Sequence, residues 1–214
     1  MSTLVISDLH LGARTGVDRL REPDVLDALA AGLADVDRLV LLGDLIELRE
    51  SAMHDVLAAA RPVLERIGAA LPGGAEIVVV GGNHDHRLLA PWLERRHGED
   101  AAPLGIEQVI EPAAAGDAAA AVAEALAPAS VRFAYPGIWL RDDVYATHGH
   151  YLDRHLTIPA FEPLSMRAVE RVLRRRVAAM EPVDGYEAVM APIYALMHEL
   201  AQTAPPASPR TATH

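Results

Sequence analysis

The chain of 214 residues contains no cysteine and is poor in basic residues. Without cysteine, the sequence excludes disulfide bridges, iron–sulfur clusters, thiolate zinc sites and a cysteine nucleophile. Its 19 basic and 30 acidic residues give a formal net charge of −11, so the whole chain lacks the electrostatic footprint of a nucleic-acid-binding protein. No apolar run approaches the roughly 18 to 20 residues that span a bilayer, and the first residues lack the basic region of a signal peptide. These absences predict a cytoplasmic protein with no transmembrane segment and no nucleic-acid partner.

The composition that remains is that of a folded protein. Hydrophobic residues make up 51% of the chain, which excludes a disordered protein. Its length suffices for one domain with a sizeable core, or for one domain with a small appendage. The ten histidines matter in the absence of cysteine, because any metal site must then use imidazole and oxygen ligands.

Short β-branched runs alternate with helical patterns in the first half of the chain. The runs 3–7, 39–42 and 77–80 predict buried strands, and the segments between them carry apolar residues at helical spacing. Pro62 is expected to kink or split the second of these helices. The strand–helix order predicts an α/β fold with a mostly parallel sheet covered by helices.

The second half of the chain predicts a different arrangement. A helix is expected over 86–96, and three further strands over 131–135, 138–140 and 144–147, joined as antiparallel hairpins. An Ala-rich helix over 117–126 precedes these strands.

Polar clusters stand at the end of four predicted strands. They are Asp8-Leu9-His10, Gly43-Asp44-Leu45-Ile46-Glu47, Gly82-Asn83-His84-Asp85 and His148-Gly149-His150. Taken singly, each has an ordinary explanation as a strand exit, a turn or a solvated loop. Because ligands bind at the carboxyl ends of the strands in open α/β sheets, the four clusters together indicate one functional site.

The residue types in these clusters favour a metal centre. Carboxylate, imidazole and amide oxygen ligands suit Mn²⁺, Fe²⁺, Zn²⁺ or Mg²⁺, of which Mn²⁺ is the ion expected here. Asp8 and His10 lie two residues apart and can chelate one ion from one side of a strand end. Asp44 has two oxygens with which to bridge two ions, and Asn83 offers a carbonyl oxygen. Two ions about 3.5–4 Å apart would clamp a phosphoryl group and activate a bridging water.

These clusters, in this order, resemble the successive motifs of the calcineurin-like metallophosphoesterase superfamily. The resemblance implies a β-sandwich of mixed sheets flanked by helices, with a dinuclear metal centre. It implies that Asp8 and His10 hold one ion, that Asp44 bridges both, and that Asn83 and His148 hold the other. The implied reaction is hydrolysis of a phosphate mono- or diester or a diphosphate by a metal-bridging hydroxide.

The resemblance also assigns two catalytic residues. His84 is implied to be a non-ligand beside the ions that contacts the phosphate and protonates the leaving oxygen. Glu47 takes the position of the acidic residue that orients this histidine. The implied partner is a small phosphorylated or diphosphate substrate, and the oligomeric state stays open.

The chain departs from the family pattern after His150. The family usually ends its site with a Gly-His-x-His cluster, and no such cluster follows here. In one interpretation, His148 is the fourth motif and the chain is a fragment; in the other, His148 to His150 are the final cluster. We favour the first, because Thr147 stands where the final motif has glycine. His150 remains a candidate ligand, and a catalytically weak or inert domain that binds metal or phosphate is the alternative function.

The segment after the motifs points toward one branch of the superfamily. The residues from His148 to Asp153 resemble the fourth motif of the UDP-2,3-diacylglucosamine diphosphatase-like branch. This branch cleaves a lipid-linked nucleoside diphosphate. Residues 163–180 predict an Arg-rich helix at the position of that branch's cap, so Arg171 and Arg175 are candidate substrate-binding residues. A solvated surface helix is the alternative.

The expected organisation follows from these assignments. Residues 1–156 form the metallophosphoesterase core, incomplete at its C-terminal side, and 157–202 form a helical cap-like segment with a second helix over 188–200. Residues 203–214 have no periodicity and are expected to be a disordered tail.

Overall fold

The computed structural model describes residues 2–16, 18–96, 102–150 and 183–203. Its central sheet has five strands in the order β1-β2-β3-β5-β4, and β6 and β7 pair as a separate two-stranded sheet. The strands are β1 Thr3–Ile6, β2 Arg38–Leu42, β3 Glu76–Val80, β4 Gln108–Ile110, β5 Ser130–Tyr135, β6 Gly137–Arg141 and β7 Val144–Thr147. Strands β1, β2, β3 and β5 run parallel, whereas β4 is antiparallel to β5. The carboxyl ends of β1, β2 and β3 therefore meet at one edge.

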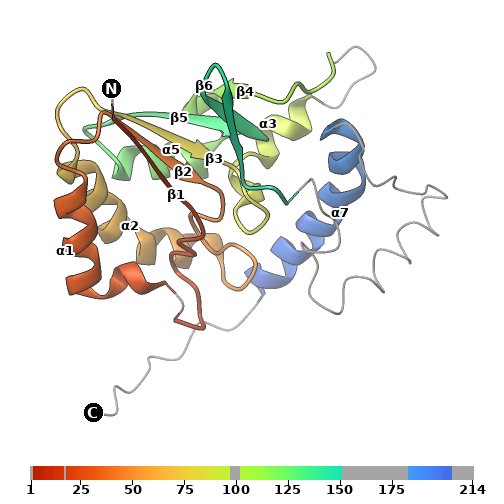
Figure 1. The fold of residues 1–214 in the computed structure, drawn as a ribbon. Helices are drawn as coiled ribbons and strands as arrows, with labels where there is room; N and C mark the ends of the chain where they lie inside the picture. Colours follow the sequence, from red (N-terminus) through yellow and green to blue (C-terminus); the bar gives the residue numbers. More distant parts are fainter. Residues whose placement is uncertain (1, 17, 97–101, 151–182, 204–214) are drawn as a thin grey trace.

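Helices connect these strands and cover the central sheet. They are η1 Arg19–Arg21, α1 Pro23–Gly32, α2 Met53–Ala70, η2 His86–Leu88, α3 Ala90–Arg95, α4 Pro112–Ala115, α5 Asp117–Ala125 and α7 Val183–Gln202. Figure 1 shows α1, α2 and α5 on one side of the sheet and α7 at the end where β3 ends. No helix among the described residues is long and apolar enough to cross a membrane. The cytoplasmic location stays a prediction.

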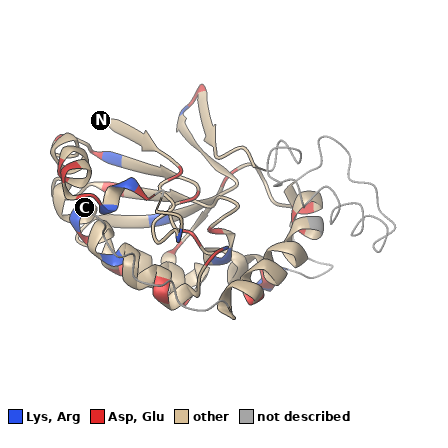
Figure 2. Ribbon diagram, turned by 90° about the horizontal axis from the view of Figure 1, so that it is seen from below, with Lys and Arg blue, Asp and Glu red and all other residues tan. Residues whose placement is uncertain are grey.

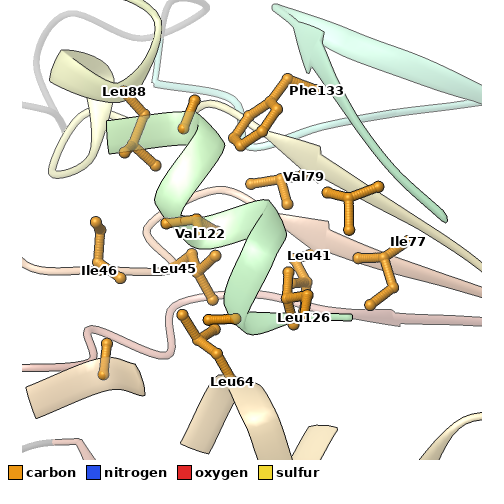
Figure 3. Close-up of a cluster of buried hydrophobic side chains, with 14 of the residues drawn as sticks. Leu41, Leu45, Ile46, Leu64, Ile77, Val79, Leu88, Val122, Leu126 and Phe133 are labelled. Carbon is orange, nitrogen blue, oxygen red and sulfur yellow. The ribbon is translucent and has the colours of Figure 1, made fainter. Parts of the chain in front are cut away.

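Side chains of the central strands alternate between two buried faces, as the period of two in a β-strand requires. One face forms the larger core with the helices, where Leu41, Ile77 and Val79 meet Leu64 of α2 and Val122 of α5 (Figure 3). The other face packs on the β6–β7 hairpin through a smaller cluster, composed of Val40, Val78, Val80, Ala134 and Ile138. The layers are therefore helices, a mixed five-stranded sheet and a two-stranded sheet, which confirms the predicted fold class.

Several local expectations are corrected by the structure. Helix α2 is not split at Pro62, because Pro62 is exposed and the carbonyl that loses its helical hydrogen bond can bond to water; the kink expected there stays a prediction. The expected helix over 86–96 is divided into η2 and α3, with Pro91 in the first turn of α3. Strand β5 does not enter a hairpin but joins β3 in parallel. Strand β4 and helix α4 were not predicted, since each has only three or four residues.

The expectations for the C-terminal part of the chain can be compared with the structure only over its described residues. The helix expected over 188–200 lies within α7. The Arg-rich helix expected over 163–180, together with Arg171 and Arg175, and nearly all of the expected tail lie outside the described residues. The domain boundaries and the substrate-binding role of these arginines stay predictions.

Close packing of α2 on α5 predicts the effect of one substitution. A Cβ atom on Gly68 would lie 2.2 Å from the backbone oxygen of Leu126, which cannot move without shifting the end of α5. We expect Gly68→Ala to lower the free energy of unfolding by about 1–3 kcal/mol, although alanine favours a helix. Urea unfolding measures the change. Gly32→Ala is the matched control, because nothing lies within 4 Å of its Cβ position; it should stabilise by about 0.5–1 kcal/mol. Equal effects at both positions would contradict this packing argument.

Candidate metal centre at the carboxyl edge of the sheet

The loops that follow β1 and β2 are joined by backbone hydrogen bonds. The N–H groups of Asp8 and His10 donate to the carbonyl oxygens of Gly43 and Asp44, at 3.1 and 2.9 Å. The N–H of Leu48 then donates to the carbonyl oxygen of His84, at 3.2 Å, which connects the second loop to the third. The convergence expected from the sheet topology is therefore present, and the backbone fixes how the side chains face one another.

Three of the predicted ligands have a backbone conformation that side chains rarely adopt. Asp8, His10 and Asp44 have φ angles of 58°, 44° and 54°, and they are the only non-glycine residues with positive φ in the described part of the chain. Such conformations cost free energy and cluster at functional sites. Their occurrence at these three positions is independent support for a site here.

The first donor group joins Asp8, His10 and Asp44. The Nε2 atom of His10 lies 3.9 Å from Oδ1 of Asp8 and 3.8 Å from Oδ2 of Asp44. One ligand atom from each residue lies within 4.8 Å of the others, a spacing that allows one ion to be held. Two carboxylates and an imidazole suit a borderline divalent ion such as Mn²⁺, Fe²⁺ or Zn²⁺.

The second donor group shares Asp44 with the first. The Nε2 atom of His148 lies 3.2 Å from Oδ2 of Asp44 and 3.2 Å from Oδ1 of Asn83. The Nδ1 atom of His148 is 3.1 Å from the carbonyl oxygen of Leu42, so Nδ1 donates there and Nε2 faces the oxygens. One oxygen of Asp44 is thus common to both groups, as expected of a bridging carboxylate.

Charge within the second group is balanced by protons. Burial alone would raise the pKa of Asp44, but the hydrogen bond and the positive charge of His148 lower it to about 2. Burial would likewise lower the pKa of His148, but the hydrogen bond and charge of Asp44 raise it to about 9. The imidazolium of His148 therefore neutralises the buried carboxylate when no metal is bound.

Glu47 forms a hydrogen bond with two histidines through a single oxygen. Its Oε2 lies 2.5 Å from Nδ1 of His84 and 3.1 Å from Nδ1 of His10. Burial would raise the pKa of Glu47, but these two hydrogen bonds contribute to lowering it to about 2. The contact with His84 is the one expected from the sequence, whereas the contact with His10 was not foreseen. Although Glu47, His10 and His84 are close enough for a metal, we interpret them as a hydrogen-bonded triad, because Glu47 holds both Nδ1 atoms.

Asp85, whose role the sequence left open, holds two site loops together. Its carboxylate is fully buried, and its two oxygens accept the N–H groups of Gly82 and Leu45, each at 2.7 Å. Burial, with the charge of Asp44, raises the pKa of Asp85 to about 6. A Cβ atom on Gly82 would lie 2.2 Å from Oδ1 of Asp44, so only glycine permits this close approach.

His150, the other predicted ligand, lies beside the site but faces different neighbours. Its ring is 5.5 Å from the ring of His148, 6.2 Å from Tyr135 and 5.7 Å from Tyr186. Burial lowers its pKa to about 3, so its imidazole is neutral at physiological pH. His150 is in neither donor group, and its role as a ligand stays a prediction.

Helix α7 is attached to the site by a buried polar cluster that sequence reasoning missed. Glu187 of α7 is 2.8 Å from Nε2 of His86, and its other oxygen accepts the hydroxyl of Tyr135. The hydroxyls of Tyr186 and Tyr194 are 2.6 Å apart in the same cluster. The available signal was the place of His86 directly after the third motif, but nothing in the sequence pairs it with Glu187.

Comparison with known proteins identifies a family for this chain. The family model described as calcineurin-like phosphoesterase matches residues 1–184. Searches of curated proteins and of solved structures found no significant match.

The charge state of His148 predicts how metal binding depends on pH. A histidine must be neutral to bind a metal, and His148 holds a proton below about pH 9. The hydrogen bond with Glu47 also raises the pKa of His10, which adds to the protons that a metal must displace. We therefore expect Mn²⁺ affinity to rise with pH and to level off near pH 9, with at least about one proton released per chain near pH 7.

Calorimetric titration in two buffers of different ionisation enthalpy measures this release. His148→Gln should reduce it by about one proton and weaken binding at least about tenfold. His54→Ala is the control, because His54 is exposed on the surface and should leave both quantities unchanged. Binding by the wild-type chain without proton release would show that the metal does not displace the proton of His148.

Proposed function

The chain belongs to the calcineurin-like phosphoesterase family, and from this we propose that it hydrolyses phosphate esters or diphosphates at a centre of two divalent ions. The observation that carries the proposal is the position of Asp44, whose Oδ2 lies 3.8 Å from His10 and 3.2 Å from His148. A carboxylate shared between two donor groups is the arrangement that a pair of neighbouring ions needs.

The donor set indicates how the ions would be held. Asp8, His10 and Asp44 would hold one, and Asp44, Asn83 and His148 the other. When bound, divalent ions supply Lewis acidity toward the phosphoryl group and toward water. Mn²⁺ is the proposed ion, because mixed carboxylate and imidazole donors suit it.

His84 is the proposed general acid. Glu47 accepts a hydrogen bond from Nδ1 of His84, so Nε2 is the nitrogen that can reach a leaving oxygen. The carboxylate of Glu47 would also stabilise the imidazolium that must form before the proton is given away. Glu47 is therefore a positioning residue for His84, and through its second hydrogen bond for His10 as well.

The proposed substrate is a small phosphorylated molecule. Figure 2 shows acidic and basic residues interspersed along the described elements, and the formal net charge of −11 does not favour binding to DNA. The more specific lipid-linked nucleoside diphosphate depends on Arg171 and Arg175, which lie outside the described residues.

Two model diesters test this function in the presence of Mn²⁺. Wild-type protein should hydrolyse bis-p-nitrophenyl phosphate, and Asp44→Asn should lose that activity almost completely, because both donor groups lose a ligand. The second diester is a dialkyl phosphate, dimethyl phosphate, whose methanol leaving group is poor, and on it His84→Ala should lower kcat by about 10²- to 10⁴-fold. The loss should be smaller on the p-nitrophenyl ester, whose leaving oxygen needs less help from an acid.

The control for these variants is Asp143→Asn, at an exposed turn residue paired with Arg141. It should retain wild-type turnover. A wild-type chain that binds Mn²⁺ but turns over neither diester would favour the alternative of an inert metal-binding domain. An equal loss in His84→Ala on both esters would remove the general-acid role while leaving the hydrolase intact.

A further inference from the structure

Arg49 places a guanidinium beside the proposed general acid. Its Nη1 lies 3.4 Å from Nε2 of His84, while Nδ1 of the same ring is held by Glu47. The backbone N–H of Arg49 also donates to Glu47, at 2.9 Å from Oε1. The histidine therefore has a carboxylate at one nitrogen and a guanidinium at the other, and Arg49 occupies the side that faces a leaving group.

Helix α7 fixes the position of this guanidinium. Nη2 of Arg49 donates to the sulfur of Met197, at 3.1 Å, and nearby the backbone N–H of Met53 donates to Gln202, at 3.4 Å. The first half of α7 is anchored separately, through the buried hydrogen bond between Glu187 and His86. Figure 1 shows α7 at the edge of the sheet where these loops lie. A half-buried arginine held on two sides is pre-organised to bind, since less side-chain freedom is lost.

The chemistry of guanidinium determines what can bind there. Its planar set of N–H donors matches two oxygens of a phosphate, whereas a neutral alcohol offers it no anionic oxygen. Because His84 gives its proton to the leaving oxygen, the group next to Arg49 is the leaving group. We propose that Arg49 binds a phosphate in the leaving group, so that this enzyme prefers diphosphates to esters of neutral alcohols. The inference rests on the proposed function and deepens it.

The reaction is a hydrolysis that needs no further reactant. The oxygen of a water molecule bonds to one phosphorus, and the bond from that phosphorus to the bridging oxygen breaks. The bridging oxygen takes the proton of His84 and leaves as part of a phosphate held by Arg49. The water loses a proton to solvent, and His84 regains one, so a diphosphate and water give two phosphates.

The test compares two substrates whose leaving groups differ in charge. They are P1,P2-dimethyl diphosphate, which releases methyl phosphate, and bis-p-nitrophenyl phosphate, whose leaving group carries no phosphate. With Mn²⁺ present, Arg49→Ala should lower kcat/KM on the diphosphate by about 10- to 100-fold. This factor corresponds to the free energy that hydrogen bonds to a charged group contribute. On the aryl ester the loss should stay within about threefold. Arg49→Lys should recover part of the loss, because it keeps the charge without the planar fork.

Arg87→Ala is the matched control, since Arg87 lies in η2 directly after His86 but pairs with Glu94 at 2.8 Å. It should remain within about twofold of wild type on both substrates. Equal losses in Arg49→Ala on both substrates, or no loss on either, would overturn the inference. So would a wild-type chain that hydrolyses the aryl ester but not the diphosphate, a result that leaves the proposed function standing.

A binding measurement separates this inference from the proposed function. Methyl phosphate is titrated into the Mn²⁺-loaded wild-type and Arg49→Ala proteins by calorimetry. The variant should bind about tenfold more weakly, and its Mn²⁺ affinity should be unchanged. If the wild-type chain turns over neither substrate, the proposed function fails, and weaker methyl phosphate binding by the variant still supports Arg49 as a phosphate-binding residue. Identical binding of methyl phosphate by the two proteins would reject the role of Arg49 as a phosphate-binding residue.

Discussion

The buried carboxylate of Asp44 is the constraint on which the rest of the site depends. Only 3% of this residue is exposed, and a buried charge is tolerated only when partners compensate for lost water. Its Oδ1 accepts the backbone N–H of His84 at 2.9 Å, and its Oδ2 meets His148 at 3.2 Å. Its backbone oxygen accepts the N–H of His10. One residue thus connects the loops that follow four strands, and both donor groups share it.

The backbone adopts unusual conformations to bring the charged side chains of the site together. The left-handed conformations of Asp8, His10 and Asp44 store strain, and the chain keeps them because the surrounding loops are cross-linked by hydrogen bonds. Gly43 lies so close to the ring of His148 that a Cβ atom would be 2.3 Å from it, and glycine there has a φ of 81°. Protonated His148 then compensates Asp44 until a cation replaces the proton. Binding and folding are therefore coupled through the same few atoms.

The parts predicted from sequence were those decided by local pattern. The apolar runs that became β2 and β3 are buried on both faces, whereas β1 lies at the edge of the sheet and is only partly buried, which corrects the expectation of a buried strand there. Hydrophobicity alone identified all three runs as strands, and strand polarity then brought Asp8, Asp44 and Asn83 to one edge. The features that the sequence did not predict depend on contacts between residues far apart in the chain. Glu187 is a single acidic residue within an ordinary helical pattern, and nothing local indicates that it is buried against His86 and Tyr135. The hydrogen bond of Glu47 with His10 and the position of Arg49 were not predicted for the same reason.

Helix α7 contacts residues that lie far before it in the sequence, and this separation affects the order in which the parts of the chain fold. His86 and Glu187 are separated by 101 positions, and Arg49 and Met197 by 148. During synthesis the strands and both donor groups leave the ribosome before α7 exists, and domains fold from the N-terminal side as they emerge. Closing so long a loop also carries an entropic cost that the earlier, shorter contacts avoid. The growing chain can therefore assemble its cation-binding loops first, and Arg49 and His86 gain their contacts with α7 only when this last helix docks.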